Sequence, residues 1–310
     1  MNHIKKLKST HPTDKYVCVV CNHTQTYPAY RYQYQNEHGQ QESTIYKCIN
    51  CHHMFIHPIP LPSLESRNMD TESDAEFFGN NFLKILHRKL VISPEIRKVK
   101  KYLASNSATV LDIGCGTGWT TSIWKENGFQ PVGLESSQAR AEIAQKRYGI
   151  PTELQHIENY QPSEKFDVAI MRHLLEHIEH PARVLEKVRG FLKDDGLIVV
   201  VIPNINSIGR FIFEEKWEWV LPWHLHFYTP KTLSALLEKC GYEKICVYQT
   251  PSPLWYPNCL RYALGENSRL GKLYARIPLI LQILPFVPIL LCGMLLNLND
   301  NMTLIFKRKS

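Results

Sequence analysis

The 310-residue sequence has no internal repeat and no long low-complexity tract, which excludes repeat architectures. The charged residues of 1–8 are followed by no apolar stretch, so the sequence indicates no secretory signal. A large excess of charge of one sign is also missing. The net charge of +7 is mild, so it permits an anionic partner without requiring one. The rest is an ordinary globular composition, 44% apolar and 21% charged, and the length is sufficient for an α/β domain with additions.

Four of the nine cysteines form two Cys-x-x-Cys pairs, Cys18 with Cys21 and Cys48 with Cys51. Two pairs at this separation predict a four-thiolate zinc ribbon, in which each pair places two thiolates on one tetrahedral ion. The residues between them, 27–46, are rich in β formers and predict a hairpin. A closed site leaves no position for chemistry, so we expect the zinc to be structural. Free and metal-bound thiols indicate a reducing cytoplasm.

An apolar strand that ends in a glycine-rich turn occupies 110–118, with the sequence Val-Leu-Asp-Ile-Gly-Cys-Gly-Thr-Gly. Gly114, Gly116 and Gly118 allow a tight turn and a close approach of the backbone to a ligand. The pattern predicts a nucleotide-cofactor loop. A dinucleotide fingerprint requires G-x-G-x-x-G, and Trp119 stands where its third glycine belongs, which disfavours an NAD-dependent enzyme.

From residue 109 onward, strand and helix patterns alternate, which predicts an α/β fold with a parallel sheet covered by helices on both faces. Helices are expected at 120–127, 138–148, 182–191 and 230–240. Two groups of apolar residues before the sheet have helical spacing, and they predict lead-in helices broken near Ser93-Pro94. The groups are Phe82, Leu86 and Leu90, and Ile96, Val99 and Leu103. Seven strands are expected, at 109–113, 130–134, near 152–156, 166–171, 196–202, 244–248 and 302–307.

With Asp112 two residues before the first glycine and Glu135 at the end of the second strand, the segment resembles class I S-adenosylmethionine (SAM)-dependent methyltransferases. The fourth-strand block 166–170 and the turn 192–196 fall in the same register. The resemblance implies a seven-stranded Rossmann-like sheet closed by an antiparallel hairpin, with Glu135 accepting the ribose hydroxyls. The implied cofactor-binding residues are Asp112, Gly114, Cys115, Gly116, Gly118, Glu135, Ser136, His156, Ile157 and Arg172.

The block 172–180 follows the fourth strand, at the sheet edge where ligands bind. His173, Glu176 and His177 share one helical face and match the H-x-x-E-H pattern of inverted zinc proteases. We reject that interpretation because the match lies inside a cofactor domain. The segment resembles the Leu-Glu-His segment of ubiquinone-biosynthesis-like methyltransferases. Some members of that family have a metal-binding acid three residues before the Glu, and this chain has His173 at that position. His177 or His173 is then either a general base or a scaffold residue.

A second cluster, the aromatic and histidine residues of 217–228, is expected either to line an acceptor pocket or to pack the domain. The run 223–230 resembles a recurrent segment of the same methyltransferases, which makes His224 or His226 the alternative base.

The ribbon followed by the proline-rich 58–62 resembles zinc-ribbon methyltransferases associated with sugar, glycan or natural-product pathways. We expect a zinc ribbon at 15–60, a linker with lead-in helices at 61–108 and a methyltransferase domain at 109–310.

The methyltransferase domain carries an apolar insertion, 251–299, whose segment 277–298 is long enough to cross a bilayer. Pro278, Pro285 and Pro288 are expected to break it, and the final strand must return to the sheet. A membrane-surface element, a lid over the acceptor and a buried helical pair remain as interpretations. Flanking cations suit an anionic surface.

The sequence thus predicts a cytoplasmic methyltransferase that uses SAM and a structural zinc, at the inner face of the membrane. The expected acceptor is a small molecule, a sugar or a lipid-linked glycan. The alternatives are an RNA methyltransferase that docks RNA through its ribbon and a non-catalytic zinc-ribbon scaffold. Nucleic acid is disfavoured because 171–174 lacks the Asn/Asp-Pro-Pro-aromatic loop and no basic cluster interleaves with aromatic residues.

Overall fold

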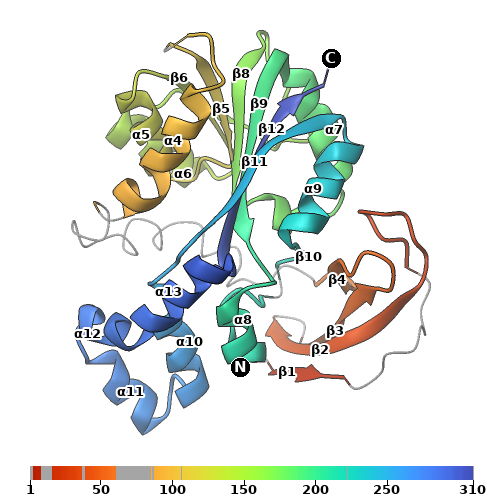
Figure 1. The fold of residues 1–310 in the computed structure, drawn as a ribbon, viewed down its shortest axis with the longest axis vertical. Helices are drawn as coiled ribbons and strands as arrows, with labels where there is room; N and C mark the ends of the chain where they lie inside the picture. The colour runs from red at the N-terminus through yellow and green to blue at the C-terminus, as the bar shows by residue number, and fades with distance from the viewer. Residues whose placement is uncertain are drawn as a thin grey trace. The chain divides into compact units, whose positions relative to one another are not determined.

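Seven strands form one sheet in the order β11-β12-β9-β8-β5-β6-β7 (Figure 1). The computed structural model describes residues 3–7, 16–36, 39–60, 85, 87–105, 107–221 and 223–309. This order confirms the predicted Rossmann-like methyltransferase sheet, and each of the seven expected strands is present. The strands are β5 (Thr109–Ile113), β6 (Gln130–Glu135), β7 (Thr152–Leu154), β8 (Phe166–Arg172), β9 (Leu192–Pro203), β11 (Tyr242–Thr250) and β12 (Asn301–Arg308).

The five strands from β7 to β9 pair in parallel. Parallel pairing puts the connecting helices on the faces of the sheet, so the strands read as continuous apolar runs. In β9 the residues 197–202 are all fully buried. The connecting helices are α5 (Trp119–Glu126), α6 (Gln138–Tyr148) and α7 (Pro181–Phe191), and α9 (Pro230–Lys239) precedes β11.

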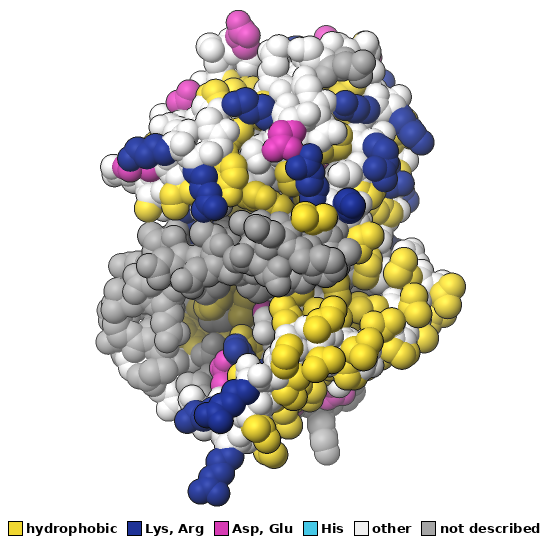
Figure 2. Space-filling model, turned by 90° about the vertical axis from the view of Figure 1, so that its left-hand side faces the viewer, with side chains coloured by type: hydrophobic (Ala, Val, Ile, Leu, Met, Phe, Trp, Pro, Cys, Tyr) yellow, Lys and Arg dark blue, Asp and Glu magenta, His cyan; other side chains and the backbone are white. Residues whose placement is uncertain are grey.

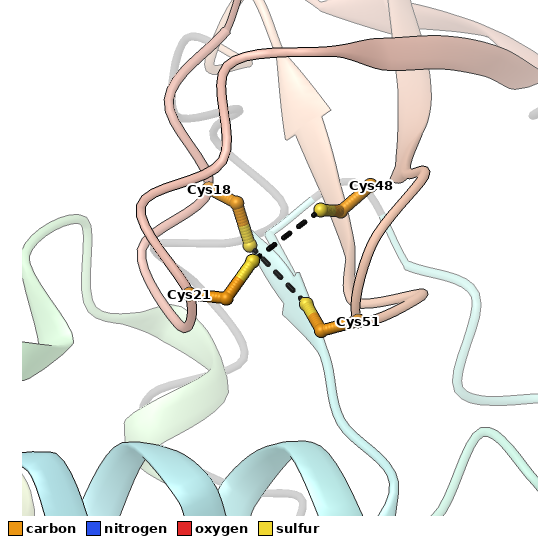
Figure 3. Close-up of side chains that lie close together, drawn as sticks. All are labelled: Cys18, Cys21, Cys48 and Cys51. Carbon is orange, nitrogen blue, oxygen red and sulfur yellow. Dashed lines mark hydrogen bonds between the residues drawn. The ribbon is translucent and has the colours of Figure 1, made fainter.

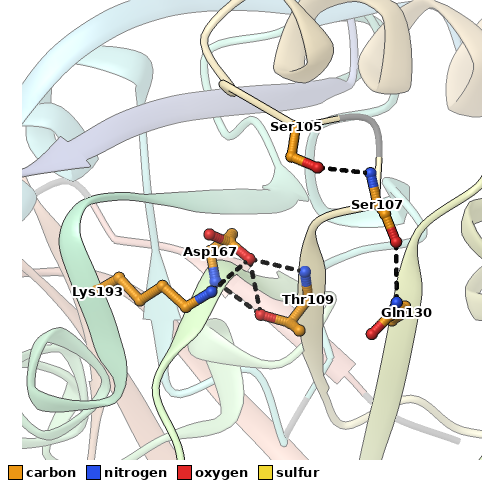
Figure 4. Close-up of polar contacts among 6 residues, drawn as sticks. All are labelled: Ser105, Ser107, Thr109, Gln130, Asp167 and Lys193. Atoms are coloured by element: carbon orange, nitrogen blue, oxygen red, sulfur yellow. Dashed lines mark hydrogen bonds and ion pairs between the residues drawn. The ribbon is translucent and has the colours of Figure 1, made fainter.

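A polar network fixes the amino ends of β5 and β8 (Figure 4). The Asp167 carboxylate accepts hydrogen bonds from the backbone N–H and the hydroxyl of Thr109, both at 2.8 Å. The Lys193 ammonium lies 2.8 Å from the same carboxylate oxygen. Burial acts to raise the pKa of Asp167, but these partners hold it below its usual value. Asp167 therefore aligns strands at the edge opposite the glycine loop.

The lead-in helix runs without a break from η1 (Arg88–Ile92), a π-helical turn, into α4 (Ser93–Lys100). Pro94 lies at the start of α4, directly after the π-helical turn, and cannot donate a backbone hydrogen bond there. The predicted break at Ser93-Pro94 is thus a change in hydrogen-bond pattern and not an end of the helix. The predicted positions Phe82 and Leu86 lie outside the described residues.

A second sheet has the order β1-β2-β3-β4-β10. It contains β1 (His3–Lys6), β2 (Thr26–Asn36), β3 (Gly39–Cys48), β4 (Met54–His57) and β10 (His226–Phe227). The predicted ribbon hairpin is β2 with β3. The ribbon sheet also takes β10 from the aromatic run that follows β9, where we expected only a loop, and His226 pairs with Phe55.

The chain divides into two compact units that each combine distant segments. Unit 1 contains residues 1–61, 202–233 and 247–303, and unit 2 contains residues 62–201, 234–246 and 304–310. Unit 1 therefore includes the ribbon, the aromatic run and the apolar insertion. Its buried core joins Ile45 and Ile56 of the ribbon to Trp217, Phe227 and Cys259.

Helices fill the rest of unit 1. They are α8 (Ile208–Phe213), η3 (Glu214–Lys216), α10 (Trp255–Leu264), α11 (Arg269–Ala275), α12 (Leu279–Ile283), η4 (Leu284–Phe286) and α13 (Val287–Leu296). The last three follow one another with helical backbone at Leu284 and Val287. Pro285 and Pro288 fall in first turns, so the expected breaks are local changes within one helical stretch.

Candidate cofactor site and cysteine cluster

The glycine loop of unit 2 connects β5 to α5 through backbone conformations that favour glycine. Gly114, Gly116 and Gly118 have φ angles of +73°, +56° and +76°. Gly118 also has no room for a side chain, since a Cβ there would lie 2.8 Å from the Cβ of Ala144 in α6. The loop therefore turns tightly and brings the start of α5 against α6.

Glu135, the last residue of β6, holds the loop from the neighbouring strand. Its buried carboxylate accepts a hydrogen bond from the Gly116 N–H at 2.9 Å. The other oxygen accepts from the N–H groups of Ser136 and Ser137, at 2.8 and 2.9 Å. An acid fixed beside a glycine turn at the carboxyl end of parallel strands is the arrangement that binds a ribose in nucleotide-cofactor folds.

Asp112 is a second buried acid, just before the loop, and Thr121 donates a hydrogen bond to it at 2.5 Å. Burial raises the pKa of Asp112 to about 6, although the Thr121 hydroxyl and the Arg172 guanidinium act against the shift. Two acids beside the loop suit a ligand that combines a diol with positive charge, as SAM does.

Cys115 is buried within the loop, and a Cβ at Gly133 would come 2.6 Å from its sulfur. Burial and the nearby carboxylates of Asp112 and Glu135 raise the pKa of its thiol. The side chain is thus a neutral thiol that fills a small space. This agrees with a packing role rather than a redox role.

After β7, the chain makes a turn in which the Asn159 and Tyr160 N–H groups donate to the His156 carbonyl. His156 is exposed and Ile157 is buried. Of this predicted pair, Ile157 lies in the interior and His156 faces solvent.

Arg172, the last residue of β8, forms a buried ion pair with Glu95 of α4 at 2.5 Å. Burial raises the pKa of Glu95 against the opposing effect of Arg172. His87 lies near this pair, and burial together with the charges of Arg172 and His173 lowers the pKa of His87 to about 3. Sequence reasoning missed Glu95 and His87. No local signal marks them, because their partner lies about eighty residues away on another element.

The histidine block that follows β8 is a short 3₁₀ turn, η2 (Leu175–His177), and not a regular helix. His173 takes a left-handed conformation, φ +51°, and its Nδ1 lies 3.5 Å from a carboxylate oxygen of the buried Glu176. His177 is half-buried. His173 and His177 thus both lie near Glu176 after the carboxyl end of β8. The predicted common helical face is wrong, because His173 is left-handed and only 175–177 form the 3₁₀ turn.

The other two predicted histidines are buried in unit 1. The Nδ1 of His224 lies 2.9 Å from the Trp219 carbonyl, and its ring stacks on the indole of Trp219. The Nδ1 of His226 lies 3.2 Å from the Nε2 of His53. His53 follows the second cysteine pair, so β10 is tied to the ribbon by side chains as well as by backbone.

The four cysteines predicted as ligands converge in unit 1 (Figure 3). The Cys18 and Cys51 sulfurs lie 3.5 Å apart, and those of Cys21 and Cys48 lie 3.6 Å apart. All four sulfurs fall within 4.8 Å of one another. A tetrahedral zinc with bonds of about 2.3 Å holds its sulfurs roughly 3.8 Å apart. The cluster therefore has the dimensions and the donor atoms of a structural zinc site.

The two cysteine pairs adopt the same local structure. In the first, the Asn22 N–H donates to the Cys18 carbonyl, and in the second, the His52 N–H donates to the Cys48 carbonyl. Asn22 and His52 both have left-handed backbones, with φ of 59° and 63°. Two equivalent turns that face each other present two sulfurs each, which is the geometry that the Cys-x-x-Cys spacing predicted.

Comparison with known proteins agrees with this geometry. The methyltransferase domain family matches residues 84–247, more than half of the chain. The chain belongs to this family, and the predicted resemblance to class I SAM-dependent methyltransferases is confirmed.

Among curated relatives, a ubiquinone biosynthesis O-methyltransferase from Bradyrhizobium diazoefficiens is 28% identical over 132 residues, 41% of this chain and 52% of the relative. A ubiquinone biosynthesis O-methyltransferase from Ruegeria sp. is 29% identical over 150 residues, which are 44% of this chain and 60% of the relative. The match thus spans about half the length of these relatives. The plantazolicin methyltransferase BpumL, solved with a pentazolic desmethylPZN analog and SAH, has a TM-score of 0.50 at 15% identity, over 80% of this chain and 92% of that chain. This last likeness shows the fold.

Proposed function

We propose that the protein transfers the methyl group of SAM to a small-molecule acceptor. The observation that carries the proposal is the Glu135 carboxylate fixed on the glycine loop, with Asp112 buried before it. Bound SAM supplies an electrophilic sulfonium methyl, and the protein's task is to align it with the acceptor and exclude water.

Each loop residue has a distinct role in this proposal. Glu135 accepts the ribose hydroxyls, and Asp112 provides negative charge near the cationic end of the cofactor. The backbone of the glycine loop can lie close to the ligand because its glycines carry no Cβ. Ser136 follows Glu135 on the same edge, and Ile157 packs against the adenine. Arg172, held by Glu95, fixes the carboxyl end of β8 beside this site.

Thermal unfolding with and without SAM tests the proposed site, because a ligand that binds only the folded state raises Tm. Glu135→Gln keeps the shape but loses a charged acceptor. We expect SAM to raise the Tm of wild type and not that of Glu135→Gln. The matched control is Glu142→Gln, an acid on α6 that pairs with Lys146, which should respond as wild type. Equal shifts in all three proteins would remove Glu135 from the site.

The acceptor proposed is a sugar or a lipid-linked glycan. His173 and His177 are the candidate bases in unit 2, and His224 and His226 are the candidates in unit 1. A base that removes the acceptor proton would give alanine variants with reduced kcat, unchanged SAM binding and an altered pH–rate profile. A scaffold residue would change stability and leave the profile in place.

We also infer that Cys18, Cys21, Cys48 and Cys51 hold one structural zinc ion. Metal analysis of the purified chain should give one zinc per chain, and Cys18→Ser should abolish it. Cys292→Ser is the matched control, because Cys292 is an exposed cysteine of the apolar insertion. Zinc retained in Cys18→Ser would contradict the assignment.

The proposed location is cytoplasmic, at the inner face of a membrane that the segment 277–298 contacts. None of the nine cysteines, all of which the structure describes, forms a disulfide, and this suits a reducing compartment. Nucleic acid has no place in this proposal. Salt-sensitive binding of RNA by the purified protein would replace the small-molecule acceptor with an RNA.

A further inference from the structure

The strongest unexplained feature of unit 1 is an exposed apolar helix, defined here as Leu279–Leu296 and made of α12, η4 and α13. It is the one helix of the described residues that is long and apolar enough to cross a membrane, with a mean hydropathy of 2.5. Only 17% of it is buried. The core helix of a soluble protein would be mostly buried, so this helix is not explained by packing.

One side of the apolar helix is anchored. Phe286 and Leu290 are buried against Tyr256 of α10. Gly293 lies close to Ile208 of α8, since a Cβ at Gly293 would meet that side chain at 3.3 Å. The spacing of four and three residues puts Phe286, Leu290 and Gly293 on one helical face. The helix therefore has a fixed orientation in unit 1.

The opposite side is bare and wholly apolar. Ile280, Leu284, Leu291 and Leu295 are 62%, 62%, 53% and 85% exposed. Spacings of four and seven residues place them along one stripe. Figure 2 shows hydrophobic side chains gathered at the right of the lower part of one face, with Lys and Arg side chains, and a few Asp and Glu, to their lower left and below.

The apolar helix and the preceding α11 carry charge of one sign only. Between Asn267 and Asn299 the sequence contains no Asp or Glu, but it contains Arg269, Lys272 and Arg276. All three cations are exposed, on α11 and its carboxyl end. An apolar face bordered by cations matches a membrane whose headgroups are anionic. In a two-fold dimer the same patch would face itself, and the like charges would meet.

The helix does not have the setting of a single membrane span. The Asn299 N–H, just after the helix, donates to the Gln249 side chain near the end of β11 at 2.7 Å. The chain thus leaves the helix beside the strand from which the insertion starts. The anchored side also packs on α10, which carries the charged Arg261. A crossing would bring these polar elements into hydrocarbon.

We propose that the apolar helix docks the protein on an anionic membrane surface. It lies in the interface with Phe286 and Leu290 toward the protein and the stripe toward the acyl chains, while Arg269, Lys272 and Arg276 contact the headgroups. The inference rests on the membrane contact in the proposed function and names its lipid class and orientation. It does not depend on methyl transfer, so vesicle binding and SAM binding can fail separately.

Flotation with vesicles tests this, using phosphatidylcholine alone or with phosphatidylglycerol. Wild type should float with the anionic vesicles, and Leu284→Glu/Leu295→Glu should reduce the bound fraction at least tenfold. Tyr102→Glu is the matched control, because Tyr102 is an apolar side chain of unit 2 with 52% exposure. It should float as wild type, and all variants should keep the wild-type Tm shift with SAM.

The headgroup contact has its own variant. Arg269→Gln/Lys272→Gln/Arg276→Gln should lose most anionic binding and its salt dependence. The control Lys101→Gln/Lys146→Gln/Lys165→Gln removes three exposed cations of unit 2 and should retain both. Flotation equal in the two triple variants would overturn the anionic selectivity.

The native Cys292 of α13 reports orientation, because it alone of the nine cysteines is exposed. Anionic vesicles should slow its reaction with a water-soluble maleimide at least tenfold, and neutral vesicles should not. Failure of wild type to float would overturn the proposal. Light scattering gives a second test. A wild-type dimer that Leu284→Glu/Leu295→Glu converts to a monomer would also overturn the proposal, because a second copy of the chain would then cover the stripe.

Discussion

Replacing Gly118 by alanine tests the geometry of the cofactor loop. Gly118 has φ +76°, and an added Cβ would lie 2.8 Å from the Ala144 Cβ and 3.0 Å from the Ala144 Cα. A left-handed backbone costs an L-residue about 1–2 kcal/mol, and crowding a packed site costs about 1–3 kcal/mol. Gly118→Ala should therefore destabilise the protein by about 2–5 kcal/mol.

Gly190→Ala is the matched control. Gly190 lies in α7, is exposed and has no atom within 4 Å of an added Cβ. Alanine in a helix is more favourable than glycine by about 0.5–1 kcal/mol, so this variant should be slightly more stable than wild type. Urea denaturation followed by circular dichroism measures both variants.

A second substitution separates the two costs in Gly118→Ala. Ala144→Gly removes the atom that the new Cβ would meet at 2.8 Å and by itself costs about 1 kcal/mol of helix propensity. The double variant should be less destabilised than the sum of the single variants by about 1 kcal/mol or more. Gly118→Ala with wild-type stability, or strict additivity with Ala144→Gly, would refute the loop geometry.

Three further predictions concern charge and metal. Asp167→Asn should lose about 1 kcal/mol at neutral pH. Because the folded pKa of Asp167 is lowered, the difference should begin to shrink below the unfolded value of about 3.9 and disappear as pH falls through the lower folded pKa, which a pH series of urea titrations checks. SAM affinity should weaken as pH falls through about 6, since burial raises the pKa of Asp112 to that value. Asp112→Asn should bind SAM weakly at every pH tested. A wild-type SAM affinity that does not change with pH would contradict the role of the Asp112 charge. Chelation of zinc should red-shift tryptophan fluorescence, because Trp217 is buried in the core that includes Ile45 of the ribbon. An unchanged spectrum in protein shown to be metal-free would mean that the metal does not support that core.

The sequence predicted the sheet well because its signals are local. A strand buried on both faces reads as a continuous apolar run, and Gly149 with φ +61° ends α6 where the helical pattern stops. The predicted helix at 138–148 has the observed bounds. The cysteine cluster was also predictable, since the spacing of each pair fixes its turn.

What the sequence could not supply depends on pairs that are distant along the chain. β10 is two residues long and exists because β4 pairs with it, so no periodicity marks it. The contact of His53 with His226 joins residues 173 positions apart. Glu95 and Arg172 are likewise separated by 77 positions. A buried acid in a first helical turn looks, in sequence, like an ordinary capping charge.

Exposure of the apolar helix is a further property that hydropathy alone leaves open. The same run of residues suits a core helix, a lid or a membrane contact. Only the structure shows that Leu295 is 85% exposed while Leu290 is buried. The distinction comes from tertiary packing on α8 and α10.

The central claim is that the glycine loop with Glu135 and Asp112 binds SAM. The most direct measurement is calorimetric titration of the zinc-replete protein with SAM and, separately, with NAD. We expect saturable binding of one SAM per chain, weakened at least tenfold in Glu135→Gln, and no binding of NAD. A folded, zinc-replete protein that binds NAD, or that binds no SAM, would contradict it.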